Sequence, residues 1–224
     1  MTTPDDAEKK RTPVAILISG RGSNMMALVE ACADPAFPAR VVLVLSNEPD
    51  AAGLTWAADR GLPTALVNHR HYPNREAFDA ALDARLREVG ARIVCLAGFM
   101  RLLTPGFVAR WPDRLLNIHP SLLPAFKGLH SHERALDAGV RLHGCTVHLV
   151  SPEMDSGPIV AQAAVPVRAD DTPESLAARV LEQEHRIYPL ALRLLAEGRL
   201  HVSGAACQVR GAKSPDGALS NPVG

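Results

Sequence analysis

The sequence predicts an α/β protein with a Rossmann-like, mostly parallel twisted sheet and helices on both faces. Two observations favour this class. Short apolar runs rich in β-branched residues alternate with helical patterns, and these runs have the composition of strands covered on both faces. A repeated strand–helix–strand order is typical of right-handed crossovers in a parallel sheet. Ligands of such sheets bind beyond the carboxyl ends of the strands.

The elements follow one another without an internal repeat or an interdomain linker. Strands are expected at 14–18, 41–45, 64–67 and 93–96, with helices between them at 24–33, 53–60 and 75–89. A short helix near 104–110, a strand-like stretch at 115–119 and strands at 143–150 and 159–167 come next. A long helix over 172–197 starts at Thr172-Pro173-Glu174 and stops at Gly198. We expect one catalytic domain at 13–210, flanked by poorly ordered tails at 1–12 and 211–224.

Charge and composition exclude several classes of protein. The chain has 224 residues, with 24 Lys plus Arg against 24 Asp plus Glu, so no net field favours nucleic acid or an anionic membrane. No run approaches the length of a membrane span, and the N-terminus lacks a signal-peptide pattern. The 4 cysteines are dispersed, without the spacing of a zinc site or a disulfide framework. A cytoplasmic protein with small-molecule partners is expected.

The stretch ISGRGSNM, residues 18–25, predicts a phosphate-binding loop. A buried strand ends there, a glycine-rich turn follows, and Asn24 opens a helix, so free N–H groups and the positive helix end converge. It is not a dinucleotide fingerprint, because that pattern requires glycine where Met25 stands, and it is not a Walker loop. The alternative interpretation is a simple tight turn.

The stretch LAGFMRLL, residues 96–103, suggests a second binding loop. Gly98 allows a sharp turn at a strand end, which would place the backbone of 100–103 along a cleft for a flat heteroaromatic ligand. Core packing is the alternative. Arg75, at a helix start, is by itself an ordinary surface arginine unless its loop folds back over the predicted phosphate-binding loop.

The stretch LLNIHPSLLP, residues 115–124, places two polar side chains inside an apolar run. Residues two apart in a strand share a face, so Asn117 and His119 project together near the strand's end. A satisfied core histidine is the alternative for His119. Asp155 lies in a turn-rich loop, SPEMDSGPI, where a turn aspartate bonding its own backbone is the alternative. Contact between His119 and Asp155 is a spatial hypothesis.

Other catalytic patterns do not occur. The sequence contains neither a GxSxG nucleophile elbow nor an HExxH metal motif. The pair His130 and His132 has no evident third ligand, which favours a helix start or a ligand-side loop over a metal site. We therefore expect no metal.

Eight segments together resemble the folate-dependent glycinamide ribonucleotide transformylase family. They are ISGRGSN, SNEPDAAGL, NREAFD, LAGFMRLL, LLNIHPSLLPAFKGLHSH, HGCTVHLV, MDSGPIVAQ and EQEHRIYP. The resemblance covers about 13 to 205. HPSLLP and DxGP are shared with other formyltransferases, including methionyl-tRNA formyltransferase, whereas GRGSN and QEH select the ribonucleotide enzyme. Ser156 stands where the family often has a second glycine.

The resemblance implies a role for each matching position. Asn117, His119 and Asp155 match the catalytic trio. The positions that match ribonucleotide-binding residues are Gly22, Ser23, Asn24 and Glu184. The positions that match folate-binding residues are Arg75, Met100, Arg101, Leu102, Leu103, Asn117, Ser151 and Asp155.

The implied reaction passes a formyl group from 10-formyltetrahydrofolate to the amine of glycinamide ribonucleotide, in a monomer or homodimer and without a metal. Asn117 and His119 would stabilise the oxyanion, and Asp155 would favour the charged form of His119. Formyltetrahydrofolate hydrolase and methionyl-tRNA formyltransferase are disfavoured, because each carries an extra domain for which this chain has no room. A nucleotide-binding module without catalysis is the rival from another class, and the complete trio disfavours it.

Overall fold

The computed structural model describes residues 10–213 and 216–222, and its centre is a seven-stranded sheet in the order β3-β2-β1-β4-β5-β6-β7. Its strands are β1 (Thr12–Ile18), β2 (Ala39–Ser46), β3 (Thr64–Leu66), β4 (Ile93–Leu96), β5 (Leu115–His119), β6 (Leu142–Leu149) and β7 (Ile159–Pro166). Neighbouring strands from β3 to β5 are parallel, whereas β6 runs antiparallel to β5 and β7 antiparallel to β6. The predicted mostly parallel sheet is confirmed.

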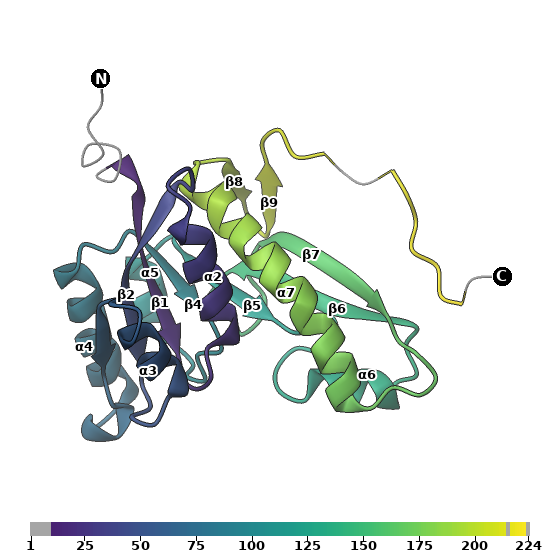
Figure 1. Ribbon diagram of the computed structural model, residues 1–224, viewed down its shortest axis with the longest axis horizontal. Coiled ribbons are helices and arrows are strands. Elements are labelled where there is room, and N and C mark those ends of the chain that lie inside the picture. Colours follow the sequence, from purple (N-terminus) through teal and green to yellow (C-terminus); the bar gives the residue numbers. More distant parts are fainter. Residues whose placement is uncertain (1–9, 214–215, 223–224) are drawn as a thin grey trace.

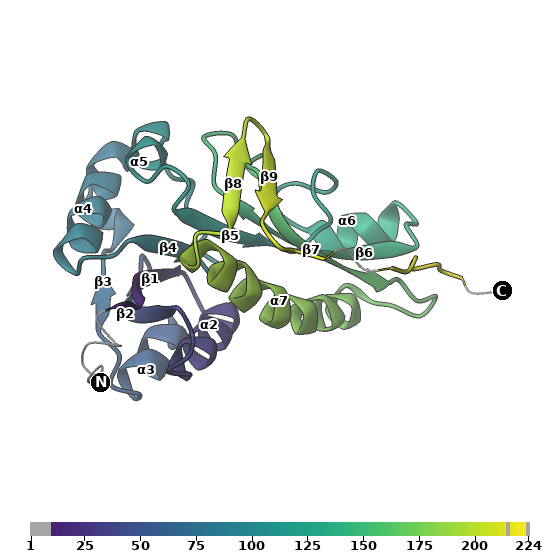
Figure 2. The ribbon, with the colours of Figure 1, turned by 90° about the horizontal axis from the view of Figure 1, so that it is seen from above.

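Helices cover both faces of this sheet (Figures 1 and 2). One face packs against α2 (Ser23–Ala33), α3 (Ala52–Ala58) and α7 (Pro173–Ala196). The other face packs against α4 (Arg75–Glu88) and α5 (Pro105–Arg110), with the short 3-10 helix η1 (His69–His71) before α4. The remaining helix, α6 (Ser131–Asp137), lies beside α7. The fold is thus the predicted three-layer arrangement.

The two cores follow from the alternation of side chains along buried strands. In β1, Val14, Ile16 and Ile18 point into the core under α2 and α7, while Ala15 and Leu17 point into the core under α4. All of these side chains have 0% exposure, which explains why the strand reads as a continuous apolar run.

Both ends of the long helix α7 are fixed by residues next to them in the sequence. Thr172 caps the N-terminus, accepting a hydrogen bond from the backbone N–H of Ser175, whose hydroxyl in turn accepts from the N–H of Thr172. Gly198 follows the helix with a φ of +67°, the left-handed conformation that ends many helices. Both predicted end signals are confirmed.

The chain continues beyond α7 into a hairpin that the sequence did not predict. Its strands, β8 (Leu200–Ser203) and β9 (Ala206–Val209), pair antiparallel in a separate two-stranded sheet. Of the expected tails, 1–9, 214–215 and 223–224 lie outside the described residues. In the C-terminal tail, the amide of Asn221 donates to the carbonyl oxygens of Arg141 (2.6 Å) and Val167 (2.8 Å). Across 10–213 and 216–222, each helix is either too short or too polar to span a membrane.

Candidate functional site

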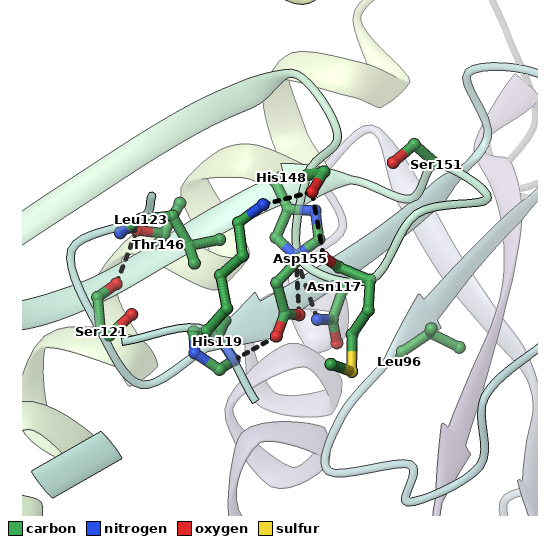
Figure 3. A network of polar contacts seen from close by, with 12 residues as sticks. Leu96, Asn117, His119, Ser121, Leu123, Thr146, His148, Ser151 and Asp155 are labelled. Carbon is green, nitrogen blue, oxygen red and sulfur yellow. Dashed lines mark hydrogen bonds and ion pairs between the residues drawn. The ribbon is translucent and has the colours of Figure 1, made fainter. Parts of the chain in front are cut away.

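Strand β5 carries the two polar side chains that the sequence places on one face. Leu116 and Ile118 point into the core under α7, while Asn117 and His119 point the other way. His119 is buried, with 6% exposure, and Asn117 is half-buried. Figure 3 shows both side chains converging with Asp155 and His148.

The ring of His119 lies between two acceptors. Its Nε2 is 3.0 Å from the carbonyl oxygen of Phe126, and its Nδ1 is 3.4 Å from Oδ2 of Asp155. The contact of Nε2 is a hydrogen bond, whereas Nδ1 and Asp155 form an ion-pair contact that is longer than a charge-assisted hydrogen bond. The contact between His119 and Asp155 that the sequence analysis put forward is therefore present.

Asp155, in the loop between β6 and β7, is held by contacts with the loop after β5 and with β6. The backbone N–H of Gly128 donates to Oδ2 of Asp155 at 2.9 Å. Oδ1 lies 3.8 Å from Nε2 of His148, beyond hydrogen-bond distance, and accepts no hydrogen bond from the described residues. Asp155 itself has a φ of +51°, a strained conformation that aspartate tolerates better than most residues. Two residues on, a Cβ on Gly157 would lie 1.7 Å from the carbonyl oxygen of Leu149, so the loop packs directly on the backbone of β6.

His148 orients the amide of Asn117, a role the sequence analysis missed. The antiparallel register places His148 opposite Asn117, and Nδ2 of the amide lies 3.1 Å from Nε2 of the ring. Nδ1 of His148 lies 2.9 Å from the carbonyl oxygen of Leu149 and must donate to it, so Nε2 accepts from Asn117. Burial lowers the pKa of His148 and outweighs the opposing charge of Asp155, which keeps the ring neutral. One N–H of Asn117 therefore stays available.

The glycine-rich loop after β1 has the backbone conformation expected of an anion-binding site. Gly22 has a φ of +74° and precedes α2, whose N-terminus has no side-chain cap. The first N–H groups of any α-helix have no partner within the helix, and in α2 no side-chain cap takes their place. In α2, Nδ2 of Asn24 donates to Oε2 of Glu184 at 2.6 Å, which joins α2 to α7 beside this loop.

Glu184 and Asn24 form a buried pair with unused acceptors. Glu184 has 6% exposure and Asn24 has 9%. Burial raises the pKa of Glu184, and the hydrogen bond from Asn24 only partly offsets this. Oδ1 of Asn24 has no hydrogen-bond partner among the described residues. The pair thus offers acceptors to a ligand that carries N–H or O–H donors.

The loop after β4 presents open backbone groups. Gly98 has a φ of +73°, the sharp turn predicted there, and the N–H of Met100 donates to Oγ of Ser19 at 2.8 Å. At the loop's end, the N–H of Thr104 donates to Asp79 of α4 at 2.7 Å. Among the described residues, no hydrogen bond uses the backbone of 101–103. These groups remain available to a ligand.

Three further predicted positions surround these loops. Arg75 is exposed at the first position of α4, one turn before Asp79, so the two share a helix face near the end of the loop after β4. Ser151 donates to the carbonyl oxygen of Glu153 at 2.9 Å and shapes the Asp155 loop. His130 is the N-cap residue of α6, which confirms the helix-start interpretation of the histidine pair.

Comparison with known proteins agrees with this geometry. Residues 12–192 match the protein family described as formyl transferase. The chain is 44% identical over 202 residues to phosphoribosylglycinamide formyltransferase of Escherichia coli K12, covering 90% of this chain and 95% of that protein. It is also 50% identical to the trifunctional purine biosynthetic protein adenosine-3 of Bos taurus over 90% of this chain, and spans 20% of that longer protein.

Solved structures show the same similarity. The glycinamide ribonucleotide transformylase 1 structure from Symbiobacterium toebii has a TM-score of 0.87 and 48% identity, covering 89% of this chain and 94% of that one. A formyltetrahydrofolate deformylase from Pseudomonas syringae shares the fold at a TM-score of 0.83 but only 25% identity, with 90% of this chain and 67% of that one covered. The arrangement of Asn117, His119 and Asp155 thus lies on a shared fold, and the chain belongs to the phosphoribosylglycinamide formyltransferase family.

Proposed function

We propose that this chain transfers the formyl group of 10-formyltetrahydrofolate to the primary amine of glycinamide ribonucleotide, a step of de novo purine synthesis. The observation that carries the proposal is the setting of His119. Its ring lies between the carboxylate of Asp155 and the carbonyl oxygen of Phe126, beside the amide of Asn117. A charged ring and a neutral amide on one strand face suit a reaction that creates an oxyanion.

In the proposed first step, the amine attacks the formyl carbon and the formyl oxygen gains negative charge. Asn117 donates the N–H that His148 does not use. His119 donates from Nδ1, because its 3.4 Å separation from Asp155 is longer than a charge-assisted hydrogen bond and leaves this N–H free to turn to the oxyanion. A single well-placed donor of this kind lowers the barrier by about 3 kcal/mol.

In the proposed second step, the carbon–nitrogen bond to the folate breaks and a proton moves. The attacking amine loses a proton, and the departing N10 of the folate gains one. Oδ1 of Asp155 has no hydrogen bond from the described residues, so it can hold a water molecule that relays this proton. Asp155 also stabilises the imidazolium of His119 throughout. The steps use side chains and water only.

The two substrates fit the two loops. The ribonucleotide phosphate binds the open N–H groups at Gly22, Ser23 and Asn24, and Glu184 accepts from the donors of the glycinamide. The pterin binds the free backbone groups of 101–103, while Arg75 pairs with a carboxylate of the folate. Both substrates are small and water-soluble, which fits a cytoplasmic enzyme.

A formyl-transfer assay tests this function. Purified protein is mixed with 10-formyltetrahydrofolate, and release of tetrahydrofolate is followed with glycinamide ribonucleotide, with methionyl-tRNA or with water alone as acceptor. We expect turnover only with the ribonucleotide. Equal release in water alone would instead identify a hydrolase, and turnover only with the tRNA would overturn the proposed acceptor.

A further inference from the structure

A polar network joins the carboxyl ends of three neighbouring strands, β2, β1 and β4. Ser19, directly after β1, donates from its hydroxyl to Oδ1 of Asn47 at 2.5 Å and accepts from the backbone N–H of Met100 at 2.8 Å. Its own N–H donates to the carbonyl oxygen of Gly98 at 3.1 Å. One serine thus makes two hydrogen bonds to the loop after β4.

Ser19 also begins the other binding loop. It is followed immediately by Gly20, Arg21 and Gly22, which lead to the N-terminus of α2, where the proposed phosphate-binding site lies. A shift of Ser19 would therefore move both loops. The side chain of Ser19 is a direct link between the loop that faces the ribonucleotide and the loop that faces the folate.

Asn47 fixes the direction of the Ser19 hydroxyl. It has 1% exposure, and its Oδ1 is occupied by Ser19, so its Nδ2 faces Oε1 of Glu48 (3.3 Å) and Nδ1 of His69 (3.2 Å). A buried amide with partners on both sides cannot flip without losing hydrogen bonds. Since Asn47 accepts the hydroxyl proton, the Ser19 oxygen must present a lone pair to Met100.

The network extends to the segment before Arg75. His69 lies in η1, and Glu48 forms an ion pair with Arg70 of the same turn at 2.8 Å. The chain then continues into α4, which begins at Arg75. The backbone of 101–103 thus follows a residue that Ser19 holds, Met100, and the η1 segment that precedes Arg75 is held to Asn47 through His69.

We propose that Ser19 and Asn47 are positioning residues that hold the folate-binding loop in register for 10-formyltetrahydrofolate. The inference rests on the proposed function. Because Ser19 takes the N–H of Met100, the backbone of 101–103 that follows is presented to the ligand in a single register. Without Ser19 the loop gains alternative positions, and the folate must select the correct one at a cost in affinity.

The test compares Ser19→Ala with Ser19→Thr, which keeps a hydroxyl, and with Ser203→Ala as a matched control. Ser203 is exposed at the end of β8, and no hydrogen bond of its side chain occurs among the described residues. Ser19→Ala should raise KM for 10-formyltetrahydrofolate about tenfold, the change that loss of an ordinary hydrogen bond produces, with kcat within about threefold of the wild type. Ser19→Thr should restore KM, and Ser203→Ala should leave it unchanged.

Asn47→Ala provides a second, independent variant. It leaves the Ser19 hydroxyl in place but removes the acceptor that orients it, so KM for the folate should rise in the same direction. A role in stability alone would lower Tm and the apparent kcat through loss of folded protein, with KM unchanged. That outcome, or a Ser19→Thr variant as weak in folate binding as Ser19→Ala, would overturn the inference.

The wild type in the same assay separates this inference from the proposed function. Absence of formyl transfer by the wild-type protein would refute the function itself. Normal transfer by the wild type together with unchanged KM in Ser19→Ala and Asn47→Ala would refute only the positioning role.

Discussion

Replacing Asp155 by asparagine removes one negative charge next to His119 and changes the shape of the site very little. Oδ2 of Asp155 is 3.4 Å from Nδ1 of His119, and both side chains are about nine-tenths buried, with 10% and 8% exposure. Asparagine retains an oxygen for the N–H of Gly128. The substitution therefore tests charge and proton relay rather than packing.

The expected loss follows from the strength of the attraction between the two charges. Oδ2 of Asp155 and Nδ1 of His119 form an ion-pair contact. Two opposite charges about 4 Å apart attract by about 1 kcal/mol in water and about 4 kcal/mol at an effective dielectric constant of about 20, which corresponds to about a 5- to 1,000-fold change in rate. The contact acts on the charge that develops in the transition state, so the loss should fall on kcat, with both KM values within about threefold of the wild type. Loss of the water relay adds to the same parameter.

Steady-state kinetics with both substrates, and Tm by differential scanning fluorimetry, measure the effect of Asp155→Asn. Asp137→Asn is the matched control, because Asp137 is exposed at the end of α6 and makes no ion pair among the described residues. The control should retain wild-type kcat. A kcat for Asp155→Asn within about twofold of the wild type, or a loss confined to KM, would refute the role given to this carboxylate.

Three further predictions concern the same site. Asn117→Ala and His119→Ala should each lower kcat, and the double variant should lose less than the product of the single losses, measured by steady-state kinetics, if both serve one oxyanion. Burial raises the pKa of Glu184, so the contribution of this one group to stability is fully present below about pH 4.3 and is lost as pH rises through its folded-state pKa. In urea unfolding, Glu184→Gln should therefore match the wild type at low pH and exceed it at pH 8, while it binds the ribonucleotide more weakly. Gly157→Ala should destabilise by more than about 2 kcal/mol in the same experiment, because its Cβ would collide with a backbone oxygen at 1.7 Å. Gly106→Ala in α5 should be neutral or slightly stabilising, because its Cβ would make only an ordinary van der Waals contact, 4.0 Å from Oγ1 of Thr104.

Local patterns were sufficient for the sheet and for the polar face of β5. Buried parallel strands are continuous apolar runs, and the period of a strand places Asn117 and His119 together whatever the rest of the fold does. The helix ends at Thr172 and Gly198 were predictable for the same reason, since capping depends on a few neighbouring residues.

The part of the site that depends on strand register was not predictable from these patterns. His148 faces Asn117 only because β6 pairs antiparallel with β5 in a particular register, and a slip of one residue would turn it into the core. The segment that contains His148, HGCTVHLV, resembles the family, but no local pattern in it predicts a contact with the amide of Asn117. The same limit applies to the Ser19–Asn47 pair, which joins strands 28 residues apart.

The backbone around His119 explains why the remaining contacts escaped prediction. Phe126 and Asp155 have positive φ angles of +53° and +51°, a conformation for which sequence rules expect glycine. These two residues supply the carbonyl oxygen and the carboxylate that face the two nitrogens of His119. The chain departs from its local preference where it must turn two acceptors towards one ring, and such strain persists only when the surrounding packing enforces it, here through the contact of Gly157 with β6. Rules based on local preference are therefore least informative at the residues whose oxygen atoms face the two nitrogens of His119.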